Sequence, residues 1–193
     1  MQEIDPFDGK HNLQFEFSQV QDIASWLKTA TIDTCIFNLE TSYNAATDKK
    51  KAFLQVFWDE FNGKRGLNKF NLTLAQLLEK PLMERGLVEQ FKEVIAEMGG
   101  DWNNPSEAAD LVDQALEMVV DAACELNPQF DRNSLYNHID KRDYAISSDR
   151  FGMELADDIK YKGEDYRLIL LADEVSQFIN KERDRYLNLQ EII

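Results

Sequence analysis

Cysteine, proline and glycine are scarce in this chain of 193 residues, which holds only 2, 4 and 8 of them respectively. The two cysteines, Cys35 and Cys124, lie far apart and form neither a disulfide framework nor a CxxC metal or redox motif. We expect both thiols to be reduced, buried and chemically inert. The low glycine and proline content argues against a long linker, and aromatic residues at 11% argue against a largely disordered chain.

Basic residues and long apolar runs are also lacking. Lys and Arg number 21 against 36 Asp and Glu, which gives a formal net charge of −15. Such a field repels phosphate backbones, so we expect no direct contact with nucleic acid or anionic lipid. No apolar run approaches the roughly 18 residues of a membrane span. The first residues, MQEIDPFDGKHNL, lack the apolar core of a signal peptide. These absences predict a cytoplasmic protein without membrane association.

Two short segments have the composition of β-strands. Residues 31–39, TIDTCIFNL, are rich in β-branched and aromatic side chains. Residues 167–172, RLILLA, include a continuous apolar run, which suits a strand buried on both faces of a parallel sheet. The chain therefore predicts a helix-rich α/β fold.

Apolar residues at helical spacing occupy most of the remaining chain. Pro81 and Gly99-Gly100 are read as helix ends, while Asn104-Pro105 and Ser147 or Ser148 are read as helix starts. Helices are predicted over 18–28, 48–62, 71–80, 82–98, 105 to about 123, 132–142, 148 to about 159, 175–179 and 184–193.

The second predicted strand ends in Asp173-Glu174, and an apolar strand followed by Asp-Glu has the form of a Walker B motif. The carboxyl edge of a parallel sheet is where α/β folds hold ligands. There Asp173 would orient the Mg²⁺ that bridges the β- and γ-phosphates of ATP, and Glu174 would polarise the attacking water. Acidic residues are common in this chain, and on the motif alone a solvated strand end is the more frequent alternative.

The residues around this pair carry a closer resemblance. The segment LILLADEVSQFI (168–179), followed by YLNLQEII (186–193), resembles the BREX phage-defence ATPases, large P-loop proteins called BrxC or PglY. In that family a Walker B strand runs into a DEV-x-Q-[YF]-I segment and then an LNLQ-containing helix. The resemblance implies ATP and Mg²⁺ as ligands, Asp173 as the metal residue and Glu174 as the catalytic residue. It also implies the remainder of the ATPase and other defence-system proteins as partners.

The phosphate-binding motif of such an ATPase, G-x-x-x-x-G-K-[ST], does not occur in this sequence. Gly9-Lys10 is followed by His11, and Gly63-Lys64 by Arg65. We therefore expect the motif upstream of Met1, and a fragment that is inactive by itself.

The order of elements fits the additional-strand type of P-loop domain, with 31–39 and 167–172 as parallel neighbours. On this reading residues 1–45 and 145–193 form a partial P-loop core, and residues 46–144 form a large helical insertion. The alternative is a helical protein–protein interaction module without nucleotide chemistry. The sheet discriminates between the two, because the ATPase hypothesis requires the two strands to be adjacent and parallel.

Overall fold

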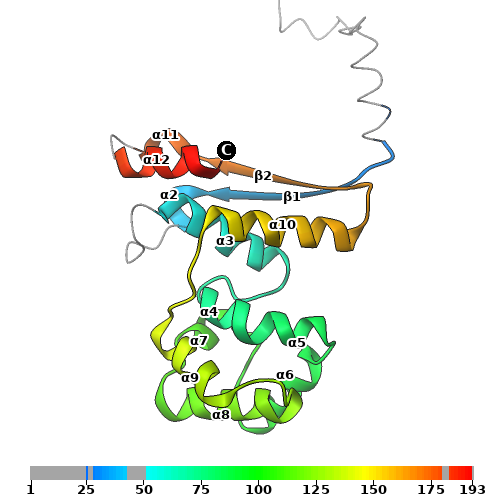
Figure 1. The fold of residues 1–193 in the computed structure, drawn as a ribbon, viewed down its shortest axis with the longest axis vertical. Helices are drawn as coiled ribbons and strands as arrows, with labels where there is room; N and C mark the ends of the chain where they lie inside the picture. Colours follow the sequence, from blue (N-terminus) through cyan, green and yellow to red (C-terminus); the bar gives the residue numbers. More distant parts are fainter. Residues whose placement is uncertain (1–24, 26–27, 43–50, 180–182, 193) are drawn as a thin grey trace, which may run out of the picture.

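A computed structural model describes residues 25, 28–42, 51–179 and 183–192 of the chain. Strands β1 (Thr31–Asn38) and β2 (Tyr166–Asp173) pair in parallel, with Thr31 opposite Tyr166 and Asn38 opposite Asp173. Figure 1 shows both arrows pointing the same way, with α11 (Val175–Ile179) following β2. The predicted helix-rich α/β chain with two adjacent parallel strands is confirmed.

One face of this sheet is covered by helices. In Figure 1, α3 (Ala52–Lys64) and α10 (Ser148–Lys162) lie along the same side of the two strands. Cys35 and Phe37 of β1 are buried there, and the Phe37 ring meets Phe57 of α3 edge to face, with the ring centroids 5.1 Å apart. Alternation along a strand sends every second side chain into this core.

The opposite face of the sheet is exposed, which corrects the expectation that 167–172 is buried on both faces. Ile36 is 72% exposed, and Leu171, its partner in the register, is 48% exposed. Ile169 is 40% exposed on the same face. A continuous apolar run identifies a strand suited to burial on both sides, but it does not say what covers each side. Among the described residues only the α3 and α10 side is packed.

The connection between the two strands contains most of the helices. After β1 comes the short α2 (Leu39–Ser42), and α3 then lies against the sheet. The elements that follow are α4 (Leu72–Leu74), η2 (Ala75–Glu79), α5 (Lys80–Glu84), α6 (Val88–Glu97), α7 (Pro105–Ala109), α8 (Asp113–Leu126) and α9 (Arg132–Lys141). We call this part, residues 72–141, the helical segment.

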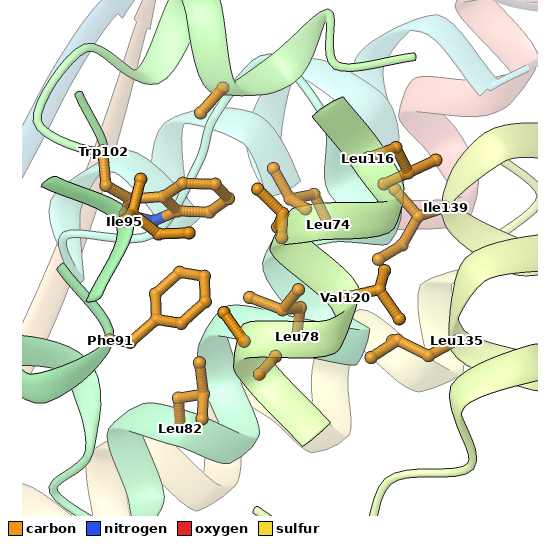
Figure 2. Close-up of a cluster of buried hydrophobic side chains, with 14 residues drawn as sticks. Leu74, Leu78, Leu82, Phe91, Ile95, Trp102, Leu116, Val120, Leu135 and Ile139 are labelled. Atoms are coloured by element: carbon orange, nitrogen blue, oxygen red, sulfur yellow. The ribbon is translucent and has the colours of Figure 1, made fainter. Parts of the chain in front are cut away.

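The helical segment has an apolar core of its own (Figure 2). Leu74, Leu78 and Leu116 are fully buried in it, and the Phe91 and Trp102 rings meet edge to face with centroids 4.8 Å apart. Each such side chain contributes about 1.5–3 kcal/mol through its burial. In Figure 1 the segment lies on the far side of α3 and α10 from the strands. Helix α3 follows residue 46 in the sequence but packs on the sheet. The division at residues 45 and 145 remains a prediction.

Three helix boundaries differ from the sequence prediction. Pro81 does not end a helix, because the π-helical turn η2 precedes it and helical backbone continues to Glu84. The backbone nitrogen of Pro81 carries no hydrogen, and its ring comes close to the carbonyl groups of the preceding turn. The wider π-helical turn leaves room for this ring. The predicted helix 82–98 is interrupted at Gly86, where φ is 68°. The helix predicted from 105 to about 123 breaks before Asp113, so that Leu116 rather than Ala115 faces the core.

Other predicted elements agree with the structure. Gly99 has φ of 86° just beyond α6, and Ser147 caps α10 by accepting the Arg150 N–H. Helices α9, α11 and α12 (Arg183–Ile192) lie close to their predicted bounds. Most of the predicted helix 18–28 lies outside the described residues. Within the described part of the chain, no helix combines the length and the apolar character that crossing a membrane requires.

Candidate functional site

Asp173 and Glu174 lie at the carboxyl edge of the parallel pair. Asp173 ends β2 and is exposed, and its Oδ1 accepts the Glu174 N–H at 2.7 Å. Glu174 follows in the left-handed backbone region with φ of 57°, and its carbonyl oxygen accepts the Phe178 N–H at 2.9 Å, at the start of α11. A non-glycine residue in this region costs of order 1 kcal/mol, so the surrounding hydrogen bonds must hold it.

Asn38 completes this edge, and the sequence analysis did not single it out. It is the last residue of β1 and the register partner of Asp173. Its Nδ2 donates to Glu174 Oε2 at 2.7 Å, joining residues that lie far apart in the sequence. The signal available in the sequence was an asparagine at the end of a predicted parallel strand. Recognising it required the register, which the sequence does not give.

The other end of the Asn38 amide is also engaged. Its Oδ1 accepts the N–H groups of Glu40 and Thr41 at 2.9 and 3.2 Å. These are free donors in the first turn of α2, so Asn38 acts as the helix cap. Two N–H donors on one side of the amide require its oxygen there, which turns the NH₂ group towards Glu174.

Helix α2 connects this edge to α3. Leu39 is fully buried, and Ser42 Oγ donates to Glu60 Oε1 of α3 at 2.8 Å. Helix α11 packs against α2 as well. The chain leaves α2 at Ser42 and enters the connection that contains α3 and the helical segment. Asn38 therefore stands between Glu174 on one side and this connection on the other.

The LNLQ part of the resemblance has a structural role in this chain. Asn188 of α12 is 2% exposed, and its Oδ1 accepts the N–H groups of Phe53 and Leu54 at 2.9 and 3.3 Å. Both N–H groups belong to the first turn of α3, where no preceding carbonyl can accept them. A side chain from a distant helix thus caps α3 and ties the end of the chain to the sheet layer.

The residues at the edge fit a magnesium ion that arrives with a nucleotide. Mg²⁺ is usually held by one or two carboxylates together with substrate phosphates and water. Asp173 presents one exposed carboxylate there, with Oδ1 oriented by the Glu174 N–H. No cluster of three or more candidate metal-ligating side chains occurs among the described residues. The exposed Asp173 carboxylate is a donor of the kind that Mg²⁺ takes when phosphates and water complete its shell.

A polar cavity of about 440 Å³ is lined by Ser42 of α2 and by Asp59, Lys69, Arg142 and Tyr144 among others. Burial is the main cause that raises the pKa of the Asp59 carboxyl to about 7. The neighbouring Glu60 adds to this rise, while the Gln55 hydrogen bond acts against it. Gln55 Nε2 donates to Asp59 Oδ1 at 2.7 Å. Composition gave no signal for this group, since it is one acidic residue among many.

Other ionisable side chains and the two cysteines have ordinary surroundings. Glu89, Glu93 and Glu97 are exposed along α6 and form a solvated face. His138 Nδ1 lies 2.7 Å from Asp143 Oδ1 at the surface. Cys35 is buried and Cys124 is half-buried, both are free, and burial raises the pKa of each thiol. Neither cysteine is therefore disposed to react as a thiolate near neutral pH.

No protein-family model matches this chain, and no solved structure matches it.

Proposed function

We propose that this chain carries the Walker B part of a P-loop ATPase of a BREX-type phage-defence system. Asp173 is assigned to the Mg²⁺ that accompanies ATP, and Glu174 to the attacking water. The phosphate-binding loop is supplied from outside this sequence, and the partners are the remainder of the ATPase and other proteins of the defence system. The proposal joins the resemblance of residues 168–179 and 186–193 to the geometry of the sheet edge.

The single observation that carries the proposal is the parallel pairing of β1 and β2 with Asp173-Glu174 at their carboxyl edge. Had the strands been antiparallel or apart, the pair would not face the crevice in which α/β folds bind ligands. The exposed apolar face at Ile36 and Leu171 agrees with a sheet that further parts of an ATPase would cover.

The two carboxylates have different tasks in the proposed reaction. Water oxygen bonds to the γ-phosphorus of ATP while the bond to the β–γ bridging oxygen breaks, and ADP leaves with that electron pair. Glu174 orients this water and accepts its proton, which a carboxylate one residue beyond the strand can reach. The Asp173 carboxylate would hold the Mg²⁺ that accompanies ATP, and this ion would supply positive charge beside the phosphates.

Nucleotide affinity in the complete ATPase tests the assignment of Asp173. The variant Asp173→Asn removes one negative charge but keeps size and an oxygen ligand. We expect ATP affinity measured with Mg²⁺ to fall about tenfold, and affinity measured with EDTA to change little. Asp165→Asn, at the opposite end of β2, is the matched control. Equal Mg²⁺-dependent affinities for wild type and Asp173→Asn would remove the metal role and favour the interaction-module hypothesis.

A further inference from the structure

An apolar groove of about 260 Å³ lies between α6 and α8 on the surface of the helical segment. Buried Ile95 and Trp102 form its floor, and both belong to the core drawn in Figure 2. Met98 and Met118 also line it and are 44% and 40% exposed. Methionine side chains are flexible and polarisable, so they adapt to the shape of an apolar partner. Asp101 is the one charged residue in the lining.

The way in which α6 ends keeps this groove open. Gly99 N–H donates to the Ala96 carbonyl at 3.0 Å, and Gly100 N–H donates to the Ile95 carbonyl at 2.9 Å, which is the hydrogen-bond pattern of a Schellman motif. A Cβ at position 100 would lie only 2.8 Å from Ile95 Cγ2. Neither glycine has a side chain that could cover Ile95, and the groove residue Ala115 of α8 is small.

The size and the walls of the groove indicate what can bind there. A cavity of about 150 Å³ holds one benzene ring, and sites for drug-sized ligands begin at about 300 Å³. The groove therefore suits one or two large apolar side chains inserted by a partner. Its walls are helices, whose backbone groups bond internally, and they offer no strand edge to an extended peptide. A helix that presents an apolar face satisfies its own backbone and fits such a groove.

The surface around the groove is strongly acidic. Residues 93–131, which form the end of α6, the following connection and α8, contain ten acidic residues and no lysine, arginine or histidine. Glu97, Asp101 and Glu117 are exposed, and in the described part of the chain none of them pairs with a lysine or arginine. Charge complementarity therefore requires positive charge beside the apolar face of the partner.

We propose that this groove binds the apolar face of a basic amphipathic helix of another protein. A second copy of the chain would bring the same negative charge to the contact, and residues 1–24 carry five acidic residues against one lysine. In Figure 1, α6 and α8 lie at the end of the helical segment farthest from β1 and β2. The groove thus stays accessible when other proteins cover the sheet, and the inference does not depend on the roles of Asp173 and Glu174.

Two pairs of substitutions test whether the helix binds in the groove. Ala115→Arg puts a long cationic side chain into the groove, whereas Gln114→Arg adds the same charge at the next position, which does not line it. Met118→Gln removes an apolar contact, and Met153→Gln makes the same change at an exposed position on α10. All four positions are exposed on helices, and arginine and glutamine are good helix formers, so we expect each variant to fold.

The probe is a synthetic peptide of leucine and lysine, about 18 residues long, with leucines on one helical face. Calorimetry with the 193-residue chain should give a Kd in the micromolar range that rises with salt concentration. We expect Ala115→Arg and Met118→Gln each to weaken binding about tenfold, and Gln114→Arg and Met153→Gln to stay within about twofold of wild type.

Two altered peptides separate the apolar face from the charge. One has the same residues in an order that scatters the leucines around the helix, and the other has glutamate in place of lysine. Both should bind at least about tenfold more weakly than the first peptide. Equal binding of either peptide, equal losses in a variant and its control, or no binding of the first peptide would overturn the proposal. A dimer of the chain that Ala115→Arg dissociates in sedimentation experiments would assign the groove to a second copy and would also overturn it.

Discussion

The Asp59 carboxyl lowers the stability of this fold at alkaline pH, and its removal is expected to stabilise the chain. Burial raises its pKa from the ordinary value of 3.8 to about 7, while the Gln55 amide donates a hydrogen bond to it. The variant Asp59→Asn keeps an oxygen that accepts this hydrogen bond and cannot ionise. At pH 8 the wild-type carboxyl is ionised in both folded and unfolded chains, and only the folded chain bears the cost of burying the charge.

The size of this effect follows from the pKa difference. A group whose pKa is higher in the folded state binds protons preferentially in that state, so stability is lost as pH rises from about 4 to about 7. At about 1.4 kcal/mol per pH unit the full shift corresponds to about 4 kcal/mol. Asp59 is half-buried and lines a cavity, so we expect solvent to reduce this to about 2 kcal/mol. For a chain of this length, that gain raises Tm by about 4–8 °C.

Thermal unfolding followed by tryptophan fluorescence at several pH values between 4 and 8 measures the effect. The Tm difference between Asp59→Asn and wild type should be small at pH 4, grow through pH 7 and then level off. Glu93→Gln, at an exposed position on α6, removes the same charge and should leave the difference from wild type flat. Parallel curves for Asp59→Asn and wild type across this range would refute the reasoning.

Three further outcomes are expected. Asn188→Ala should lower the free energy of unfolding by about 1–2 kcal/mol in urea titrations, because two N–H groups of α3 lose their acceptor, whereas Asn188→Asp should restore most of it. Glu154→Ala should lower the free energy of unfolding by about 3 kcal/mol, because it leaves Arg65 and Lys80 without their shared carboxylate. Glu84 is an exposed second partner of Lys80, and a similar loss for Glu84→Ala would contradict this reasoning. Calorimetry of the 193-residue chain with Mg²⁺-ATP should detect no tight binding, because carboxylates alone repel a polyphosphate, and micromolar binding would refute our account of the missing loop.

The strands and the acidic pair could be predicted from the sequence because each carries a local signal. The run of residues 167–172 has the apolar continuity of a parallel strand, and Asp173-Glu174 follows it directly. Helix caps formed by typical capping residues, such as Ser147 before α10, could also be predicted. These features depend on a few neighbouring residues, and no distant contact overrides them.

The contacts that complete the site could not be predicted, because each joins residues far apart in the chain. Asn38 reaches Glu174 only through the register of β1 and β2, and Asn188 reaches the first turn of α3 only after α12 has packed. The pKa of Asp59 depends on how much water surrounds it, which composition does not give. The break before Asp113 was not predicted for a different reason. The apolar stripe of the sequence continues across this break, although the backbone at Asp113 is not helical there, with φ of 47°.

Single-turnover ATP hydrolysis by Glu174→Gln in the complete ATPase tests the central claim most directly. Glutamine keeps the size of the side chain and an oxygen that can accept the Asn38 amide, but it cannot accept a proton from water. We predict that the variant binds Mg²⁺-ATP as wild type does and hydrolyses it about 10²–10⁴-fold more slowly, the usual contribution of a general base. A wild-type rate of hydrolysis by Glu174→Gln would contradict the catalytic assignment, even in a protein whose strands pair as described here.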